Sequence, residues 1–190
     1  MLILILGLVI FFAAHVFVSF RPQREAVIAR LGLGPYKGLY SLVAATGLAL
    51  IIWGFIRYRS EGLIQIWEPP HWLHHVAMPL VWFAFVALAS RRAPAGRIKG
   101  WLRHPMLVAV KAWALAHFLV NGDLGGMLLF GSFLTFGVYD RIAVKQRGDE
   151  GAPRLDHFTR GDAIALGAGT VVYAIVLLLH PYLFGVAVVA

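Results

Sequence analysis

The chain has 190 residues, 60% of them hydrophobic and only 14% charged, and its formal net charge is +8. A soluble domain normally carries about 25% charged residues, so the composition indicates an integral membrane protein, here read as one domain over residues 1–190. The basic residues lie in short loops beside apolar runs, which excludes a nucleic-acid surface, and the absence of cysteine excludes disulfides, iron–sulfur clusters and CxxCH haem attachment.

The first apolar segment, residues 2–20, has no basic residues before it and no small-x-small cleavage site, so it is predicted to be a retained span. Further apolar runs approach the roughly 17 to 25 residues that cross a bilayer. Backbone groups in lipid must bond internally, so each run is predicted to be helical. The expected fold is an all-α six-transmembrane-helix bundle with spans at 2–20, 39–56, 72–89, 105–120, 124–139 and 163–183.

Lysine and arginine are distributed unevenly among the connections between these spans. The connections that follow spans one, three and five are rich in both, whereas the others hold only Arg57 and Arg59. The positive-inside rule therefore predicts that both termini lie on the periplasmic side. A faint echo between AAHVFV at 13–18 and LAHFLV at 115–120 is compatible with an inverted three-plus-three repeat.

Two histidines fall inside predicted spans. His15 and His117 each lie about 20 Å along a helix from its entry side, which is deep in a core about 30 Å thick. An ionisable residue at such depth is a site hypothesis by default. Two imidazoles on facing helices suit the axial positions of a haem iron. The alternative is that each histidine hydrogen-bonds a neighbouring helix.

The residues around the two histidines are compatible with a flat macrocycle. Ala114 lies on the same helix face as His117 and would leave room, and Asn121 follows His117 by four residues. Phe11 and Phe12 precede His15 and could pack on a porphyrin.

Other polar residues have competing interpretations. Arg103 and His104 precede Pro105 at a helix start, where an interfacial anchor or cap competes with a propionate-binding role. The stretch WEPPHWLHH places three histidines at the mouth of span three, as a metal site or within an aromatic belt. Lys111 is expected to snorkel or to pair with an acid, and Asp162 to form an interfacial pair. The three histidines of WEPPHWLHH are His71, His74 and His75. His180 is interpreted as part of a helix terminus.

Three stretches, RLGLGPYKGLYSLVAATGLALIIWG, RHPMLVAVKAWALAHFLVNGDLGGMLLFGSF and LHPYLFGV, closely resemble the NnrU family over nearly the whole chain. NnrU-like proteins are bacterial membrane proteins linked to denitrification and nitric oxide metabolism. The resemblance therefore implies a bacterial inner membrane protein, with nitrite or nitric oxide reductase components as partners.

The family also resembles 15-cis-zeta-carotene isomerase, a haem b membrane protein in which a histidine pair binds iron and a cysteine exchanges with one ligand. The likeness implies that His117 and His15 are the iron ligands here. The cysteine position corresponds to Ala114, so that ligand exchange cannot operate in the same form.

The leading prediction is a membrane haem b protein that supports nitrogen-oxide respiration by electron transfer, gas sensing or reductase maturation. One alternative is a haem-dependent isomerase or oxidoreductase that acts on a carotenoid-like polyene, with an apolar small molecule as its partner. The other is a haem-free assembly factor for a respiratory complex. Arg103, His104 and Asn121 are predicted to hold propionates or to orient ligands. No hydrolase or nucleotide-binding motif appears.

Overall fold

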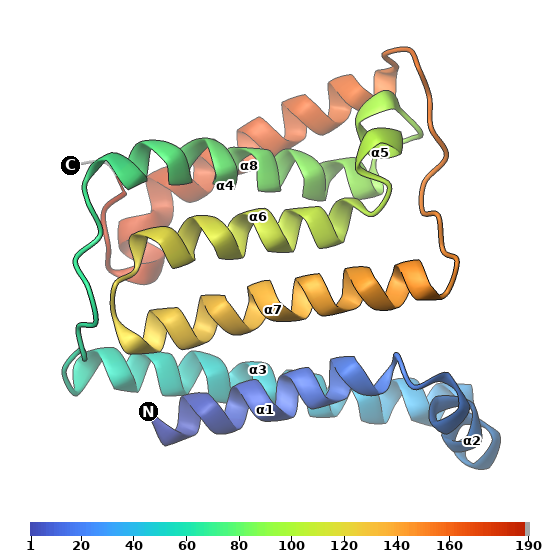
Figure 1. The fold of residues 1–190 in the computed structure, drawn as a ribbon, viewed down its shortest axis with the longest axis horizontal. Coiled ribbons are helices and arrows are strands. Elements are labelled where there is room, and N and C mark those ends of the chain that lie inside the picture. The colour runs from blue at the N-terminus through green and yellow to red at the C-terminus, as the bar shows by residue number, and fades with distance from the viewer. Residues whose placement is uncertain (189–190) are drawn as a thin grey trace. The chain divides into compact units, whose positions relative to one another are not determined.

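The computed structural model describes residues 1–188, and within them the regular structure is helical. Figure 1 shows the course of the chain. The helices are α1 (Leu2–Phe17), α2 (Arg21–Leu31), α3 (Leu33–Ser60), α4 (Trp72–Arg92), α5 (Arg97–Leu102), α6 (Pro105–Val120), α7 (Leu124–Gln146) and α8 (Arg160–Phe184).

Four of these helices, α3, α4, α7 and α8, are long and apolar enough to cross a membrane. A fifth span results if α1 and α2, which bend by 88° at their junction, count as one broken span, and α6 is apolar but shorter. The chain is therefore a multi-pass membrane protein. The expected count of six full spans is not confirmed, because 16 residues in α1 or α6 rise only about 24 Å.

The helices group into two compact units. Unit 1 comprises residues 1–68 and 122–132, and unit 2 comprises residues 69–121 and 133–190. Helices α1 to α3 with the start of α7 form the first unit, and α4, α5, α6 and α8 with the rest of α7 form the second. This grouping does not follow the expected three-plus-three division, so the inverted repeat is not confirmed.

Glycines allow α1 and α3 to approach closely within unit 1. A Cβ atom at Gly47 would lie 2.7 Å from the backbone nitrogen of Phe11, and one at Gly7 would lie 2.6 Å from that of Ile51. Gly54 faces the backbone of Leu4 in the same way. Lipid is as apolar as the helix surfaces, so no hydrophobic effect drives two helices together in a membrane. Small residues allow the close backbone contact through which dispersion forces hold the helices instead.

A single methyl group at this contact should therefore destabilise unit 1. We expect Gly47→Ala to lower the free energy of unfolding by about 1–3 kcal/mol, because the backbone of α1 must move away. Gly38→Ala is the matched control on the same helix, since a Cβ there meets nothing within 4 Å, and it should be neutral or stabilising by about 0.5–1 kcal/mol. Thermal unfolding in detergent measures both, and equal midpoints would contradict this account.

In unit 2, α4 packs along both α6 and α8. Gly169 of α8 lies against the backbone of Val86, and Trp82 Nε1 donates a hydrogen bond of 3.0 Å to Thr170 Oγ1. On the other side, small residues of α6 are buried, among them Ala109, which packs with Ala87 of α4. Close contacts at small residues explain why these helices, which lack a clear polar and apolar face, still pack against specific partners.

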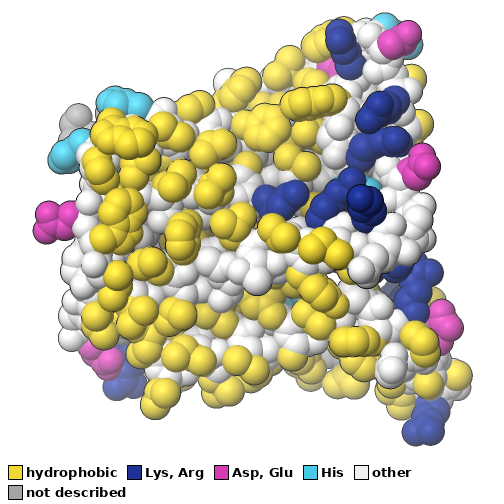
Figure 2. Space-filling model, viewed as in Figure 1, with side chains coloured by type: hydrophobic (Ala, Val, Ile, Leu, Met, Phe, Trp, Pro, Cys, Tyr) yellow, Lys and Arg dark blue, Asp and Glu magenta, His cyan; other side chains and the backbone are white. Residues whose placement is uncertain are grey.

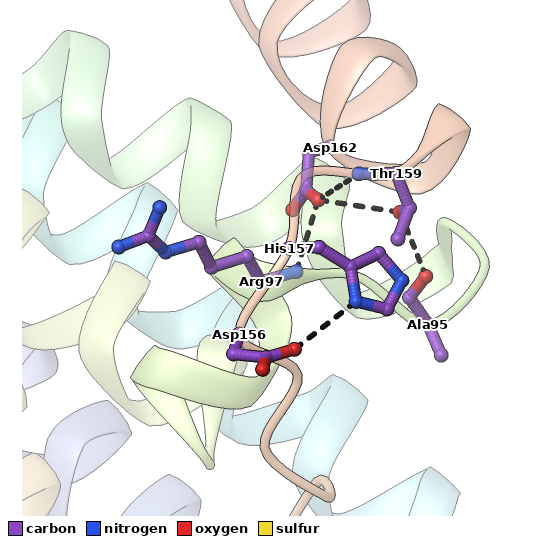
Figure 3. A network of polar contacts seen from close by, with 6 residues as sticks. All are labelled: Ala95, Arg97, Asp156, His157, Thr159 and Asp162. Carbon is purple, nitrogen blue, oxygen red and sulfur yellow. Dashed lines mark hydrogen bonds and ion pairs between the residues drawn. The ribbon is translucent and has the colours of Figure 1, made fainter.

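Asp162 joins the start of α8 to the start of α5 (Figure 3). This carboxylate is 1% exposed. It accepts hydrogen bonds from the backbone nitrogens of Arg97 at 2.9 Å, Ile98 at 2.7 Å and Thr159 at 2.8 Å, while Thr159 Oγ1 accepts from Gly161. The sequence prediction of an interfacial ion pair is wrong here, because the carboxylate satisfies unpaired N–H groups at two helix starts.

The outer surfaces of the helices are apolar. Large hydrophobic side chains are exposed along α3 and α8, including Leu42, Trp53, Val171 and Leu178, and Figure 2 shows hydrophobic side chains along the helices with lysine and arginine near their ends. Exposed apolar surface of this extent would be unfavourable in water. It indicates contact with the hydrocarbon layer of a bilayer.

Candidate functional site

His15 lies in the last turn of α1 in unit 1. Its Nδ1 atom is 2.7 Å from the carbonyl oxygen of Phe11, one turn earlier. Its ring lies 4.2 Å from the Phe11 ring and 5.7 Å from the Tyr40 ring of α3, measured between centroids. The imidazole is thus held by a backbone bond along its own helix and by aromatic rings on two sides.

His117 lies in the last turn of α6 in unit 2 and repeats this arrangement. Its Nδ1 atom is 2.9 Å from the carbonyl oxygen of Trp113, again one turn earlier. Its ring centroid is 5.1 Å from that of Trp113, whose ring also contacts Phe133 of α7 edge-on at 5.5 Å. Asn121 Nδ2 donates to the carbonyl of His117 at 2.7 Å and closes the helix end.

These bonds decide the tautomer of both rings. A backbone carbonyl can only accept, so Nδ1 must carry the proton in His15 and in His117. The basic lone pair then belongs to Nε2, the nitrogen that points away from the helix backbone. Metal-binding histidines are usually held in this way, with one ring N–H donated to a carbonyl and the other nitrogen available to the metal. Each histidine by itself thus has the tautomer that is usual for a metal-binding histidine. That the two share one haem stays a prediction.

The depth of both histidines in a membrane stays a prediction. A 16-residue helix rises about 24 Å, which is less than a hydrocarbon core about 30 Å thick. Helices α1 and α6 would therefore end inside that core if each begins at a membrane surface. Sequence reasoning missed Tyr40 and Trp113. Trp113 could have been found from the sequence, because it precedes His117 by four residues just as Phe11 precedes His15.

The predicted neighbours of the histidines have distinct environments. Phe12 contacts Phe11 edge-on, with centroids 5.3 Å apart. Ala114 is fully buried, so its small side chain serves close packing in the structure. A role of either residue against a porphyrin stays a prediction.

Arg103 and His104 form a strained turn between α5 and α6. Arg103 has φ 61° and ψ −55°, and the backbone nitrogen of His104 is 2.6 Å from the carbonyl of Leu102, which together define a γ-turn. The loop after α7 docks on this turn: Ala152 N donates to Arg103 O at 2.8 Å, and His104 Nε2 lies 3.2 Å from the Asp149 carbonyl. Their predicted role in holding propionates stays a prediction.

Gly151 allows that docking, and a side chain there should release the loop. Its φ is +73°, and a Cβ would lie 2.8 Å from both the Arg103 carbonyl carbon and His104 Nε2. Gly148 has a similar φ of +69° but open space around it. We expect Gly151→Ala to speed protease cleavage of the loop more than Gly148→Ala. Both substitutions introduce the strain of about 1–2 kcal/mol that a side chain suffers at positive φ. Only the Cβ at residue 151 also clashes with Arg103 and His104. Equal cleavage rates would refute the docking role.

The remaining candidates have structural explanations. His74 Nδ1 lies 3.3 Å from the His71 carbonyl, and within residues 1–188 no group of three or more metal-binding side chains is placed to hold an ion. His180 Nδ1 bonds the Val186 carbonyl at 2.7 Å beyond the end of α8, which agrees with the predicted helix terminus. The stem of Lys111 occupies the space that Gly137 of α7 leaves.

No protein of curated function and no solved structure matches the chain. The model of one family, described as NnrU protein, matches residues 3–188. This match covers nearly the entire sequence and agrees with the resemblance found in its motifs. The chain belongs to the NnrU family.

Proposed function

We propose that this protein is a membrane haem b protein of nitrogen-oxide respiration, with His15 and His117 as the axial ligands. One observation supports the proposal above the others. Both histidines of the proposed site donate Nδ1–H to the carbonyl four residues earlier, which leaves Nε2 as the basic nitrogen of each ring, as in most metal-binding histidines. Burying two imidazoles in lipid is costly without such a purpose.

The chain contributes binding, orientation and exclusion of water. The Phe11 and Trp113 carbonyls fix the rings of His15 and His117, and the aromatic rings beside them restrict rotation. The apolar helices keep water from the imidazoles. A bound haem supplies one-electron redox chemistry at its iron.

Electron transfer is the activity that this ligand set supports best. An iron held by both His15 and His117 would have no open position for a substrate until one of them left. Membership of the NnrU family suggests a role in denitrification or nitric oxide metabolism. Nitrite or nitric oxide reductase components are then the proposed redox partners, at the bacterial inner membrane with both termini in the periplasm.

An absorption spectrum of the purified protein tests the proposal. Protein from haem-replete cells should show a Soret band, with sharp low-spin α and β bands after reduction by dithionite. A reduced spectrum of the high-spin type would reject two histidine ligands and favour an open iron, as the isomerase alternative requires. The absence of a Soret band would reject haem altogether and favour the assembly factor.

A further inference from the structure

A cavity of about 260 Å³ lies in unit 1, where α1 ends and α2 turns away. Its lining carries no exposed polar atom. Leu39 and Val43 line it and are themselves exposed, so the cavity opens at the surface. The other lining residues are Ala14, Phe17, Val27, Tyr36 and Tyr40.

Two buried polar atoms at this corner lack partners. Arg24 Nε and Tyr36 Oη are the two buried side-chain donors without a hydrogen bond in the described part of the chain. They lie together, because the guanidinium carbon of Arg24 is 5.6 Å from the Tyr36 ring centroid. Tyr36 is 7% exposed and lines the cavity. Buried donors are nearly always satisfied, so these two donors suit a ligand that brings acceptor oxygens.

The charge of the surrounding segment indicates which molecule. Helix α2 bends 88° from α1, as expected for a helix that leaves the bilayer and follows its surface. The segment from residue 21 to residue 37 carries four basic side chains and one acidic one, Glu25. Basic surface helices attract anionic lipid headgroups. The four basic residues are Arg21, Arg24, Arg30 and Lys37.

We propose that this corner is a binding site for one anionic phospholipid. An acyl chain occupies the cavity between α1, α2 and α3, and phosphate or ester oxygens accept hydrogen bonds from Arg24 and Tyr36. Each feature accounts for one part of the ligand: the apolar lining for the chain, the two donors for oxygen acceptors, and the basic segment for the negative charge.

The size and lining of the cavity argue against other occupants. A volume of about 260 Å³ is below the roughly 300–1,000 Å³ of sites for drug-sized ligands, so a whole porphyrin does not fit inside it. Ordered water needs two to four polar partners. Among the lining side chains only Tyr36 and Tyr40 carry a polar group, so water would not fill the apolar remainder of the cavity. Part of a hydrocarbon chain satisfies both limits.

Native mass spectrometry of the full chain in mild detergent tests the proposal. We expect delipidated protein to bind one phosphatidylglycerol about tenfold or more tightly than phosphatidylcholine. The phosphate charge of phosphatidylcholine is offset by its choline cation, which the basic segment repels, whereas phosphatidylglycerol keeps a net negative charge that Arg24 can pair with. Arg24→Gln should abolish this preference, and Tyr36→Phe should reduce it.

The matched control is Arg30→Gln, which removes an exposed charge of the same helix and should retain the preference. Ala14→Phe should fill the cavity and weaken both lipids, with folding checked by circular dichroism. Equal binding of the two lipids by the unmodified chain would overturn the proposal. Equal losses in Arg24→Gln and Arg30→Gln would also overturn it, because they would show a diffuse charge effect. Neither result depends on haem binding.

Discussion

Replacing His117 by alanine is expected to abolish the low-spin haem spectrum. His117 is held by the Trp113 carbonyl, and an alanine side chain has no atom that can bind iron. Alanine favours helix, so α6 should persist and the loss should be specific to the ligand. Absorption spectra of oxidised and dithionite-reduced protein measure the effect.

His15→Ala is expected to give the same loss, since a bis-imidazole iron needs both ligands. His75→Ala is the matched control, because this exposed histidine lies at the start of α4 and outside the proposed site. Added imidazole should restore low-spin bands in either ligand variant by occupying the vacated space. An unchanged spectrum in His117→Ala would reject that residue as a ligand, and loss of the spectrum in His75→Ala would reject the assignment of this pair.

Asp162→Ala is expected to be the most destabilising single substitution outside the proposed haem site. The change leaves the part-buried backbone donors of Arg97, Ile98 and Thr159 without their carboxylate acceptor. A buried donor left without its acceptor costs about 1–3 kcal/mol. Part-buried donors fall at the low end of this range, so we expect a total loss of about 3 kcal/mol. For a chain of this size, that loss lowers the midpoint of thermal unfolding by roughly 6–12 °C.

Asp156→Ala is the control for this substitution. Asp156 is exposed, and the hydrogen bond that His157 donates to it holds the pKa of its carboxyl below the usual range. Removing a surface carboxylate should change the midpoint little. Asp162→Asn should fall between the two, because the amide retains one acceptor oxygen. Similar midpoints for Asp162→Ala and Asp156→Ala would show that the cap does not hold α5 and α8 together.

Hydropathy alone located the apolar helices but not the polar ones. The expected segments 39–56, 124–139 and 163–183 fall within α3, α7 and α8, whose ends extend further. Helix α2 was missed because its sequence RPQREAVIARL is polar around most of its circumference. Pro22 at its first turn was an available start signal.

The sequence by itself determined the membrane class, the helical secondary structure, the presence of one histidine in each of two apolar helices and the exclusion of cysteine chemistry, because composition and hydropathy are local properties of the chain. Only the tertiary structure decided the Asp162 cap, the close contact of α1 with α3 and the cavity beside Tyr36. Asp162 bonds residues 64 and 65 positions away, and such contacts depend on which distant segments pack together, which no local pattern encodes.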